Sequence, residues 1–243
     1  MGKWGLLLAV ALFAGWLGVF ALLAPRLQGV LEEGLSWLSQ FDEPARGCAP
    51  LGPSSASLAS HSRIGGPAPL PSRAVQFFLV PLGDFPTESL DVFASYYRAR
   101  WDLDIKVLPT EDLDEDAWNP QRSQFTAEQL VRQLDRVRVA IGERDDAVIF
   151  GLLNDDIYIA SRTDWRFAFS YRDGYSGVLS ACRMNPESLG ERTDPELAWL
   201  RMRKMLTKQV ALYHGVPASD NPKSAVFRNI LGVDDLDRMT EEI

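Results

Sequence analysis

Histidine and cysteine, the residues that most often bind metals or act as nucleophiles, are scarce in this chain of 243 residues. The sequence contains two of each, namely His61, His214, Cys48 and Cys182. This scarcity excludes zinc fingers and nearly every other metal site built from histidine and cysteine alone. Because His61 lies in a segment rich in Pro, Gly and Ser, any histidine-dependent catalysis would have to use His214.

Carboxylate pairs and lysines are the other residues that could do chemistry. Asp155-Asp156 and Asp234-Asp235 could serve in acid–base hydrolysis, but neighbours on a strand point to opposite faces, which makes Asp155-Asp156 a poor pair. Lys204 or Lys208 could activate a serine nucleophile, although no serine motif lies near them. A hydrolase without a metal therefore stays open as an alternative.

Both lysines and His214 lie on a predicted helix over residues 194–215. Asp194 is a typical N-cap, and Pro195 suits the first helical turn. Apolar residues at helical spacing predict a stripe that is buried on one side of this helix: Trp199, Met202, Leu206, Val210 and Tyr213. A second stripe is basic and consists of Arg201, Lys204 and Lys208.

Alternating strands and helices must position these residues. Apolar runs with β-forming residues predict strands, most strongly over 147–153 and also over 74–82, 103–108, 156–160, 167–171 and 177–181. Amphipathic patterns predict further helices beginning at Pro86 and over 125–141. This order predicts an α/β (α+β) fold with a mixed β-sheet and packed helices. The sequence contains neither a Gly-x-Gly-x-x-Gly nor a Walker A phosphate loop.

Several short motifs occur in the order and spacing of one known family. Residues 119–125 read N-P-x-R-x-Q-aromatic, residues 151–159 begin G-L-x-x-x-D-I-Y, and residues 178–183 read V-x-S-x-x-R. The helix segment 204–215 resembles the zinc helix of the metzincins, whose pattern is H-E-x-x-H-x-x-G-x-x-H. Over roughly residues 75–240 the chain resembles the archaemetzincins, a metzincin family of zinc-dependent proteases, and this resemblance implies a metzincin-like fold.

The resemblance also implies zinc-site positions that this chain fills with other residues. Lys204, Lys208 and His214 stand where the family has its three histidines. Met205 stands at the position of the glutamate, and Ala211 at that of the glycine. A lysine ammonium has no lone pair for zinc, and methionine cannot take a proton from zinc-bound water. We therefore expect no zinc or other cofactor, no catalytic residues at these positions, and a zinc-binding motif that has been lost.

Two interpretations of the basic stripe stay open. The three side chains could form an ordinary solvated helix face. Alternatively, Lys204 and Lys208 could stand in the old metal cleft, replace the charge of the metal, and pair with carboxylates of residues 234–237. His214, at the end of the helix, could complement the helix dipole and the terminal carbonyls, a role that we favour over metal ligation.

The N-terminal region is strongly apolar. Trp4–Ala24 comprises 21 residues without a charge, enough for a helix that crosses the hydrocarbon core of a membrane. We expect residues 1–26 to form an uncleaved transmembrane anchor, although a cleaved signal peptide or a buried helix could also account for them. We further expect an amphipathic juxtamembrane helix over 27–43, a linker rich in Pro, Gly, Ser and Ala over 44–73, and a globular domain over 74–243.

The distribution of charge bears on partners and location. The chain has 25 Lys and Arg against 33 Asp and Glu, a net charge of −8, and no basic run, which excludes nucleic acid as a partner. Lys3 and the α-amine precede the apolar segment and Arg26 follows it, so we place the globular domain of this single-pass membrane protein outside the cytoplasm. There Cys48 and Cys182 could form a disulfide, or they could be two unrelated thiols.

These expectations converge on a membrane-anchored, archaemetzincin-like protein. It would be a pseudo-metalloprotease that acts as a binding or scaffold domain for a protein partner. A related hypothesis makes it a component of a cell-envelope complex, which differs from the first only in the identity of the partner. The alternative is an active peptidase or another hydrolase that uses a non-standard site in the same cleft. The sequence does not decide whether the protein is an enzyme, but the loss of two histidines and the glutamate argues against enzymatic activity.

Overall fold

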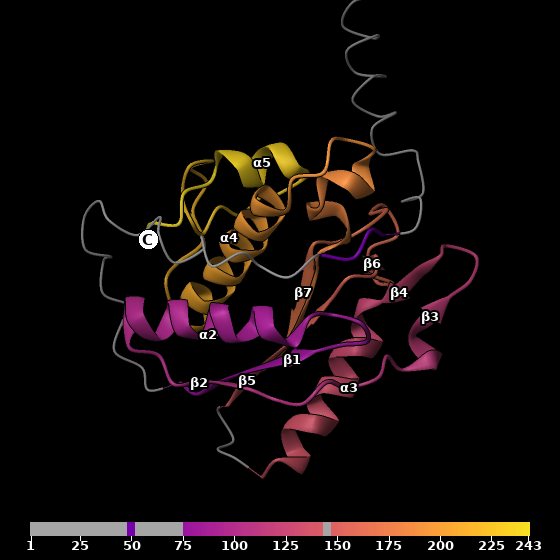
Figure 1. The fold of residues 1–243 in the computed structure, drawn as a ribbon, viewed down its shortest axis with the longest axis horizontal. Coiled ribbons are helices and arrows are strands. Elements are labelled where there is room, and N and C mark those ends of the chain that lie inside the picture. The colour runs from indigo at the N-terminus through magenta and orange to yellow at the C-terminus, as the bar shows by residue number, and fades with distance from the viewer. Residues whose placement is uncertain (1–47, 52–74, 143–146) are drawn as a thin grey trace, which may run out of the picture. The chain divides into compact units, whose positions relative to one another are not determined.

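The computed structural model describes residues 48–51, 75–142 and 147–243, which form a layered α/β arrangement (Figure 1). A five-stranded sheet in the order β2-β1-β5-β8-β7 is the middle layer. Its strands are β1 (Phe77–Pro81), β2 (Ile105–Val107), β5 (Val148–Leu153), β7 (Ser170–Asp173) and β8 (Ser176–Ser180). Its strand pairs are parallel except for β7 and β8, an antiparallel hairpin at one edge. The predicted mixed sheet is confirmed.

Helices cover both faces of this sheet (Figure 1). Helices α2 (Thr87–Trp101) and α4 (Pro195–Tyr213) lie on one face, and α3 (Ala127–Ala140) lies on the other. Strand alternation divides the core accordingly, so that in β1 Phe77 and Leu79 pack toward α2 and α4, whereas Phe78 and Val80 pack toward α3. The parallel strands are therefore apolar on both faces.

Shorter elements surround the main sheet. A second sheet has the order β3-β4-β6 and consists of β3 (Trp118–Asn119), β4 (Gln124–Thr126) and β6 (Ile157–Tyr158). Single 3₁₀ turns occur at η2 (Glu115–Ala117), η3 (Cys182–Met184) and η4 (Pro186–Leu189). Near the C-terminus, α5 (Val233–Arg238) packs against α4.

The predicted elements occur in the predicted order, and two boundaries differ. The helix expected over 125–141 begins at Ala127, because Gln124–Thr126 pairs with both β3 and β6 as strand β4. The strand expected over 167–171 lies later, at Ser170–Asp173, where its register with β8 places the hairpin turn at Gly174. Tertiary pairing therefore decided both boundaries over local propensity.

A glycine in β5 allows the sheet and α3 to pack closely. A Cβ atom at Gly151 would lie 2.6 Å from Cδ1 of Leu82 and 2.9 Å from Cδ1 of Leu134. Both leucines are completely buried, so neither has open space into which it could move. The glycine that begins the motif over 151–159 therefore serves the packing of the two layers.

The predicted membrane anchor, Trp4–Ala24, lies outside the described residues, as do the segment 27–43 and most of the linker 44–73. No helix within the described part of the chain is long and apolar enough to cross a membrane. The described residues all fall in one compact unit, Ala45–Ile243.

Candidate functional site

Helix α4 and its C-terminal cap carry every residue that the zinc-helix resemblance selects. The Asp194 carboxylate accepts a hydrogen bond from the Leu197 N–H at 3.0 Å, and Pro195 occupies the first turn. His214 is the C-cap, and Gly215 follows with a φ of +83°, the left-handed conformation that favours glycine. The predicted helix and both of its end signals are confirmed.

The apolar side of α4 packs into the core between the sheet and α2. Every residue of the predicted apolar stripe is buried there: Trp199, Met202, Leu206, Val210 and Tyr213. Met205, at the position of the family's glutamate, belongs to the same core and is 3% exposed, and Ala211 is completely buried. A buried thioether contributes packing and no proton transfer, so these two positions support the fold in this chain.

Lys204 is held by the C-terminal segment. Its ammonium group donates hydrogen bonds to the carbonyl oxygens of Leu236, at 2.8 Å, and Asp237, at 3.1 Å. Burial lowers the pKa of Lys204, and the negative charges of Asp237 and Glu241 oppose that effect. In the second of the two interpretations this segment holds Lys204, and it does so, but with main-chain carbonyls in place of carboxylates.

Arginines on α4 take the carboxylates instead. The Arg201 guanidinium binds both carboxylate oxygens of Asp237, at 2.9 and 2.8 Å, and Arg203 pairs with Glu241. Both arginines are 3% exposed because the chain around α5 covers this side of α4. The interpretation of the basic stripe as a solvated helix face is therefore wrong.

Replacing Lys204 with methionine keeps most of the side-chain volume and removes the charge. The carbonyl groups of Leu236 and Asp237 would lose their donor, so we expect Lys204→Met to lower the free energy of unfolding by about 1–3 kcal/mol. Chemical denaturation of the full chain measures this change. The matched control Lys223→Met, at an exposed lysine, should change it by less than about 0.5 kcal/mol, and equal effects would contradict the assignment.

Lys208 is the buried cation of α4 for which the described residues provide no counter-charge. Its side chain is 9% exposed, and within the described chain its ammonium group has no hydrogen-bond or ion-pair partner. Burial, together with the positive charge of Arg172 on β7, lowers the pKa of Lys208 to about 8. Among the described residues Lys208 forms no ion pair with residues 234–237, so the interpretation in which this lysine pairs with their carboxylates is wrong.

Lys208→Met should stabilise the fold near neutral pH, since burial and the charge of Arg172 disfavour the Lys208 cation in the folded chain. The pKa of a lysine is 10.5 when unperturbed, and that of Lys208 is about 8 in the folded chain. Between these pH values the unfolded state binds more protons than the folded state, so the free energy of unfolding of the wild type rises with pH. The advantage of the variant, on the order of 1–2 kcal/mol below about pH 8, should therefore shrink toward zero near pH 10. Thermal melts of both proteins over this range measure it, and a pH-independent difference would show that the lysine charge is not the cause.

His214 occupies the end of α4 and packs into the core. Its N–H donates to the carbonyl of Val210 at 3.1 Å, which closes the last turn. Its ring is 5% exposed and stacks on Phe77, with 5.7 Å between the ring centroids. The backbone of His214 therefore closes the helix and its ring packs in the core, and the interaction of its imidazolium with the helix dipole stays a prediction.

The residues at the family's zinc positions do not converge on one point. Lys204 is bonded to the C-terminal segment, whereas His214 packs on β1. Among the described residues, no three side chains of His, Cys, Asp or Glu are grouped so that they could hold a metal ion. A set of two ammonium groups, a thioether and one imidazole does not fit zinc, which needs neutral nitrogen, thiolate or carboxylate donors.

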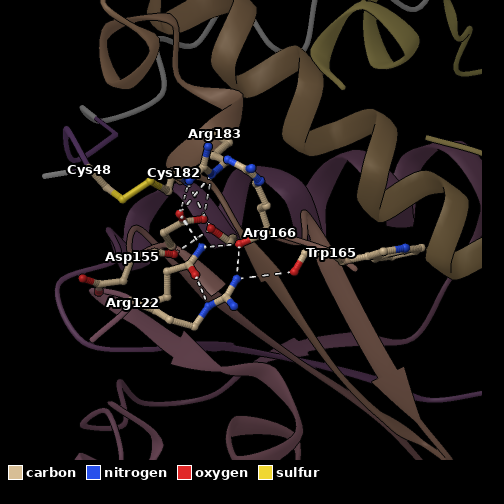
Figure 2. Close-up of polar contacts among 10 residues, drawn as sticks. Cys48, Arg122, Asp155, Trp165, Arg166, Cys182 and Arg183 are labelled. Atoms are coloured by element: carbon tan, nitrogen blue, oxygen red, sulfur yellow. Dashed lines mark hydrogen bonds and ion pairs between the residues drawn. A yellow bond between two sulfur atoms is a disulfide. The ribbon is translucent and has the colours of Figure 1, made fainter. Parts of the chain in front are cut away.

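The other three motifs of the resemblance meet in one buried polar network (Figure 2). Arg183, from the motif over 178–183, binds the Asp156 carboxylate through Nε, at 2.9 and 3.1 Å, and through Nη2, at 2.7 Å. Gln124 donates to the same carboxylate at 2.9 Å, and Arg122 donates to Oε1 of Gln124 at 2.9 Å. Side chains from three motifs that are separate in the sequence thus form one chain of hydrogen bonds.

Arg122 connects this network to the smaller sheet. Its Nη2 donates to the carbonyl oxygens of Trp165, at 3.4 Å, and Arg166, at 2.7 Å, and its guanidinium lies 4.3 Å from the ring centroid of Tyr158. Asn119 donates to the Tyr158 hydroxyl at 2.9 Å. These contacts join the smaller sheet to the rest of the domain. In the sequence, only the polar character of the motif residues indicates them.

The carboxylate pairs considered for hydrolysis have other surroundings. Asp156 is occupied by the network, and the half-buried Asp155 has its pKa raised by burial and by the charges of Asp84 and Asp156. Asp235 accepts a hydrogen bond from the Leu231 N–H at 2.9 Å. Structural contacts therefore engage one carboxylate of each pair.

A disulfide joins Cys48 to Cys182 at the beginning of η3, beside the network (Figure 2). We call residues 48–51 the strap. Leu51 ends the strap: its N–H donates to Oδ1 of Asn154 at 3.2 Å, and its side chain, 4% exposed, joins the core. The strap is thus fixed to the domain both covalently and by packing.

Relatives in sequence come from the archaemetzincins, although no family model matches the chain. Archaemetzincin from Haloquadratum walsbyi is 26% identical over 148 residues, which cover 60% of this chain and 82% of that relative. Archaemetzincin from Natronomonas pharaonis is 25% identical over 148 residues, with the same coverage of both chains. Each match spans most of the relative's own length.

Solved structures share the fold. Archaemetzincin from Archaeoglobus fulgidus superimposes with a TM-score of 0.54 and 22% identity, covering 69% of this chain and 94% of that chain. A zinc-dependent peptidase from Methanocorpusculum labreanum gives a TM-score of 0.58 at 17% identity, covering 68% of this chain and 94% of that chain. Together with the relatives in sequence, these structures identify the chain as archaemetzincin-like.

Proposed function

We propose that this chain is a membrane-anchored, archaemetzincin-like protein without peptidase activity, which acts as a binding or scaffold domain for a protein partner. One observation carries the proposal. The Lys204 ammonium, at the position of the family's first zinc ligand, is bonded to the carbonyls of Leu236 and Asp237. The positive charge of this ammonium group would repel a zinc ion, and its nitrogen has no lone pair with which to bind one.

The neighbouring positions support the same conclusion. Peptide hydrolysis at a catalytic zinc requires three protein ligands and a general base beside the zinc-bound water. Met205, at the place of that base, is buried in the core and has no proton to exchange. Lys208 would bring a further positive charge to the same helix.

The proposed anchor depends on the sequence of residues 4–24, whose length and lack of charge suit a membrane span. The disulfide between Cys48 and Cys182 supports a location of the domain outside the cytoplasm, because such bonds persist in oxidising compartments. Extraction of the natural membrane fraction with carbonate, and then with detergent, would test the anchor. Release by carbonate alone would contradict it.

Metal analysis of the purified full chain, combined with digestion of a peptide library, tests the loss of activity. We expect substoichiometric zinc and no cleavage, with the Methanocorpusculum labreanum peptidase, purified in the same way, as the positive control. Stoichiometric zinc together with cleavage would overturn the proposal. Cleavage without zinc would instead establish the alternative, a hydrolase with a non-standard site.

A partner protein is the remaining part of the proposal. Co-purification from detergent-solubilised membranes, with the chain tagged at its C-terminus, should recover a stoichiometric partner. Recovery of the chain alone at native expression levels would favour a lone anchored domain and count against a scaffold role.

A further inference from the structure

The strap lies against the domain as a bound peptide would, because side chains from outside it bond to its main chain. The Ala49 N–H donates to the hydroxyl oxygen of Ser188 at 3.0 Å, and Nδ2 of Asn185 donates to the Ala49 carbonyl at 3.0 Å. The Leu51 N–H donates to Oδ1 of Asn154 at 3.2 Å. We call Asn154, Asn185 and Ser188 the strap site. Its three side chains come from two separate parts of the domain and meet on one short extended segment.

The sequence of the strap matches this pattern of bonds. Pro50, which is exposed, stands between the two bonded residues and has no N–H that would need an acceptor. A proline also disfavours the helical conformation of the residue before it, so the half-buried Ala49 tends to be extended, with its N–H and carbonyl free for the strap site. The Leu51 side chain, 4% exposed, joins the core that α2 and α4 share with the sheet. A small residue, a proline and a leucine in this order therefore fit the site.

The topology of the main sheet also points to this place. From β1 the chain passes through α2 to β2 on one side, and it later enters β5, on the other side of β1, through α3. Helices α2 and α3 cover opposite faces of the sheet (Figure 1). The carboxyl ends of β1 and β5 therefore form a topological switch point, which is where open α/β sheets bind their ligands.

Asn154 connects the strap to this switch point. It follows directly after β5, and its Nδ2 donates to Oδ1 of Asp84, in the loop after β1, at 3.0 Å. The other end of the same amide, Oδ1, accepts the bond from the Leu51 N–H. The strap thus occupies the position at which the sheet topology favours a ligand.

We propose that the strap site is a recognition site for an extended segment of a partner protein in which a small residue, a proline and a leucine follow one another. The strap fills the site while the disulfide between Cys48 and Cys182 is intact, and it keeps other segments out. This inference rests on the proposed function, because it names the kind of segment that the binding domain recognises.

Reduction of the disulfide by a dithiol opens the site. Cys182 is completely buried and Cys48 is half-buried, so the first thiolate of the dithiol attacks the Cys48 sulfur and Cys182 leaves as a thiolate. The second thiolate closes the reductant to a disulfide and releases Cys48, and the two protons of the dithiol pass to the two cysteines. The strap is then held by noncovalent contacts alone, for which a segment of the partner can compete.

Covalent capture of a peptide by Cys182 tests the site. The full chain with Cys48→Ser, purified in detergent, keeps Cys182 as its one cysteine. It is equilibrated in a glutathione redox buffer with the acetylated and amidated peptide Cys-Ala-Pro-Leu-Gly, the sequence of residues 48–52. The peptide thiolate displaces glutathione from its mixed disulfide with Cys182, and intact mass spectrometry measures the fraction of chains that carry the peptide. The matched peptide has aspartate in place of leucine.

We expect the leucine peptide to be captured at least about tenfold more than the aspartate peptide, because its leucine takes the buried place of Leu51. Adding Leu51→Asp to the variant removes the strap as a competitor and should raise the capture further. Ser188→Ala removes one acceptor and should lower it by about twofold to tenfold, whereas Ser95→Ala, at an exposed serine of α2, should leave it unchanged. The oxidised wild type should capture neither peptide.

The partly reduced wild type, in which Cys48 and the peptide compete for Cys182, gives a second measurement without any substitution. An unfolded chain would capture both peptides equally, so a preference for leucine also shows that the chain is folded. Equal capture of the two peptides by the variant and by the partly reduced wild type would overturn the inference, as would capture that Ser188→Ala leaves intact. Stoichiometric zinc with cleavage of peptides would overturn the proposed function without changing these ratios, whereas equal capture by a zinc-free chain would refute this site alone.

Discussion

Asp156→Asn should lower the free energy of unfolding by about 3–5 kcal/mol, the cost of leaving the buried guanidinium of Arg183 without its counter-charge. The side chains of Arg183 and Asp156 are 10% and 3% exposed, so water cannot replace the lost carboxylate. Gln124 would lose a charged acceptor in the same step. Urea denaturation of the full chain, followed by circular dichroism, measures the change.

A double-mutant cycle separates the pair from its surroundings. Arg183→Gln should destabilise the chain about as much as Asp156→Asn, and the double variant should lose far less than the sum, because neither charge is then left alone. Asp164→Asn, at an exposed aspartate, serves as the control and should lie within about 0.5 kcal/mol of the wild type. A loss below about 1 kcal/mol for Asp156→Asn would place this pair with exposed ion pairs and refute its structural role.

Reduction of the disulfide should lower the free energy of unfolding by about 2–5 kcal/mol. Cys48 and Cys182 are separated by 134 residues, so the bond restricts a long loop of the unfolded chain. Its loss would also release the strap, which buries Leu51 in the core. Thermal melts with and without a reductant measure the effect.

The matched control is the double variant Cys48→Ala, Cys182→Ala. It should be destabilised to the same extent as the reduced wild type, and the reductant should not change it further. Leu51→Ala in the oxidised chain isolates the packing part of the effect and should cost about 2–4 kcal/mol. A reduced wild type as stable as the oxidised one would contradict any contribution from the bond.

Local features of the fold could be predicted from the sequence. The start and end of α4 follow from Asp194, Pro195 and Gly215, whose preferences act within one helical turn. The apolar run of β5 likewise predicts a strand that is buried on both faces. The family resemblance then supplied the arrangement of the elements, which local propensity does not encode.

Contacts between distant segments could not be predicted in the same way. A basic stripe on a helix has the same pattern whether solvent or another segment covers it, and the acceptors of Lys204 lie at least 32 residues away in the sequence. The partners Arg183 and Asp156 are likewise 27 residues apart. Their pairing depends on how β4, β6 and η3 come together, so the sequence could mark these residues as motif members without revealing that they bind one another.

The disulfide also determines what a cut in the backbone would do. Cys48 precedes residues 52–74, and Cys182 lies within the domain. A protease that cleaved between residues 52 and 74 would sever the main chain but leave residues 1–51 attached to the domain through sulfur. If residues 4–24 anchor the chain, as we propose, such cleavage would not shed the domain from the membrane. Shedding would require a reductant as well, which makes release a two-step event.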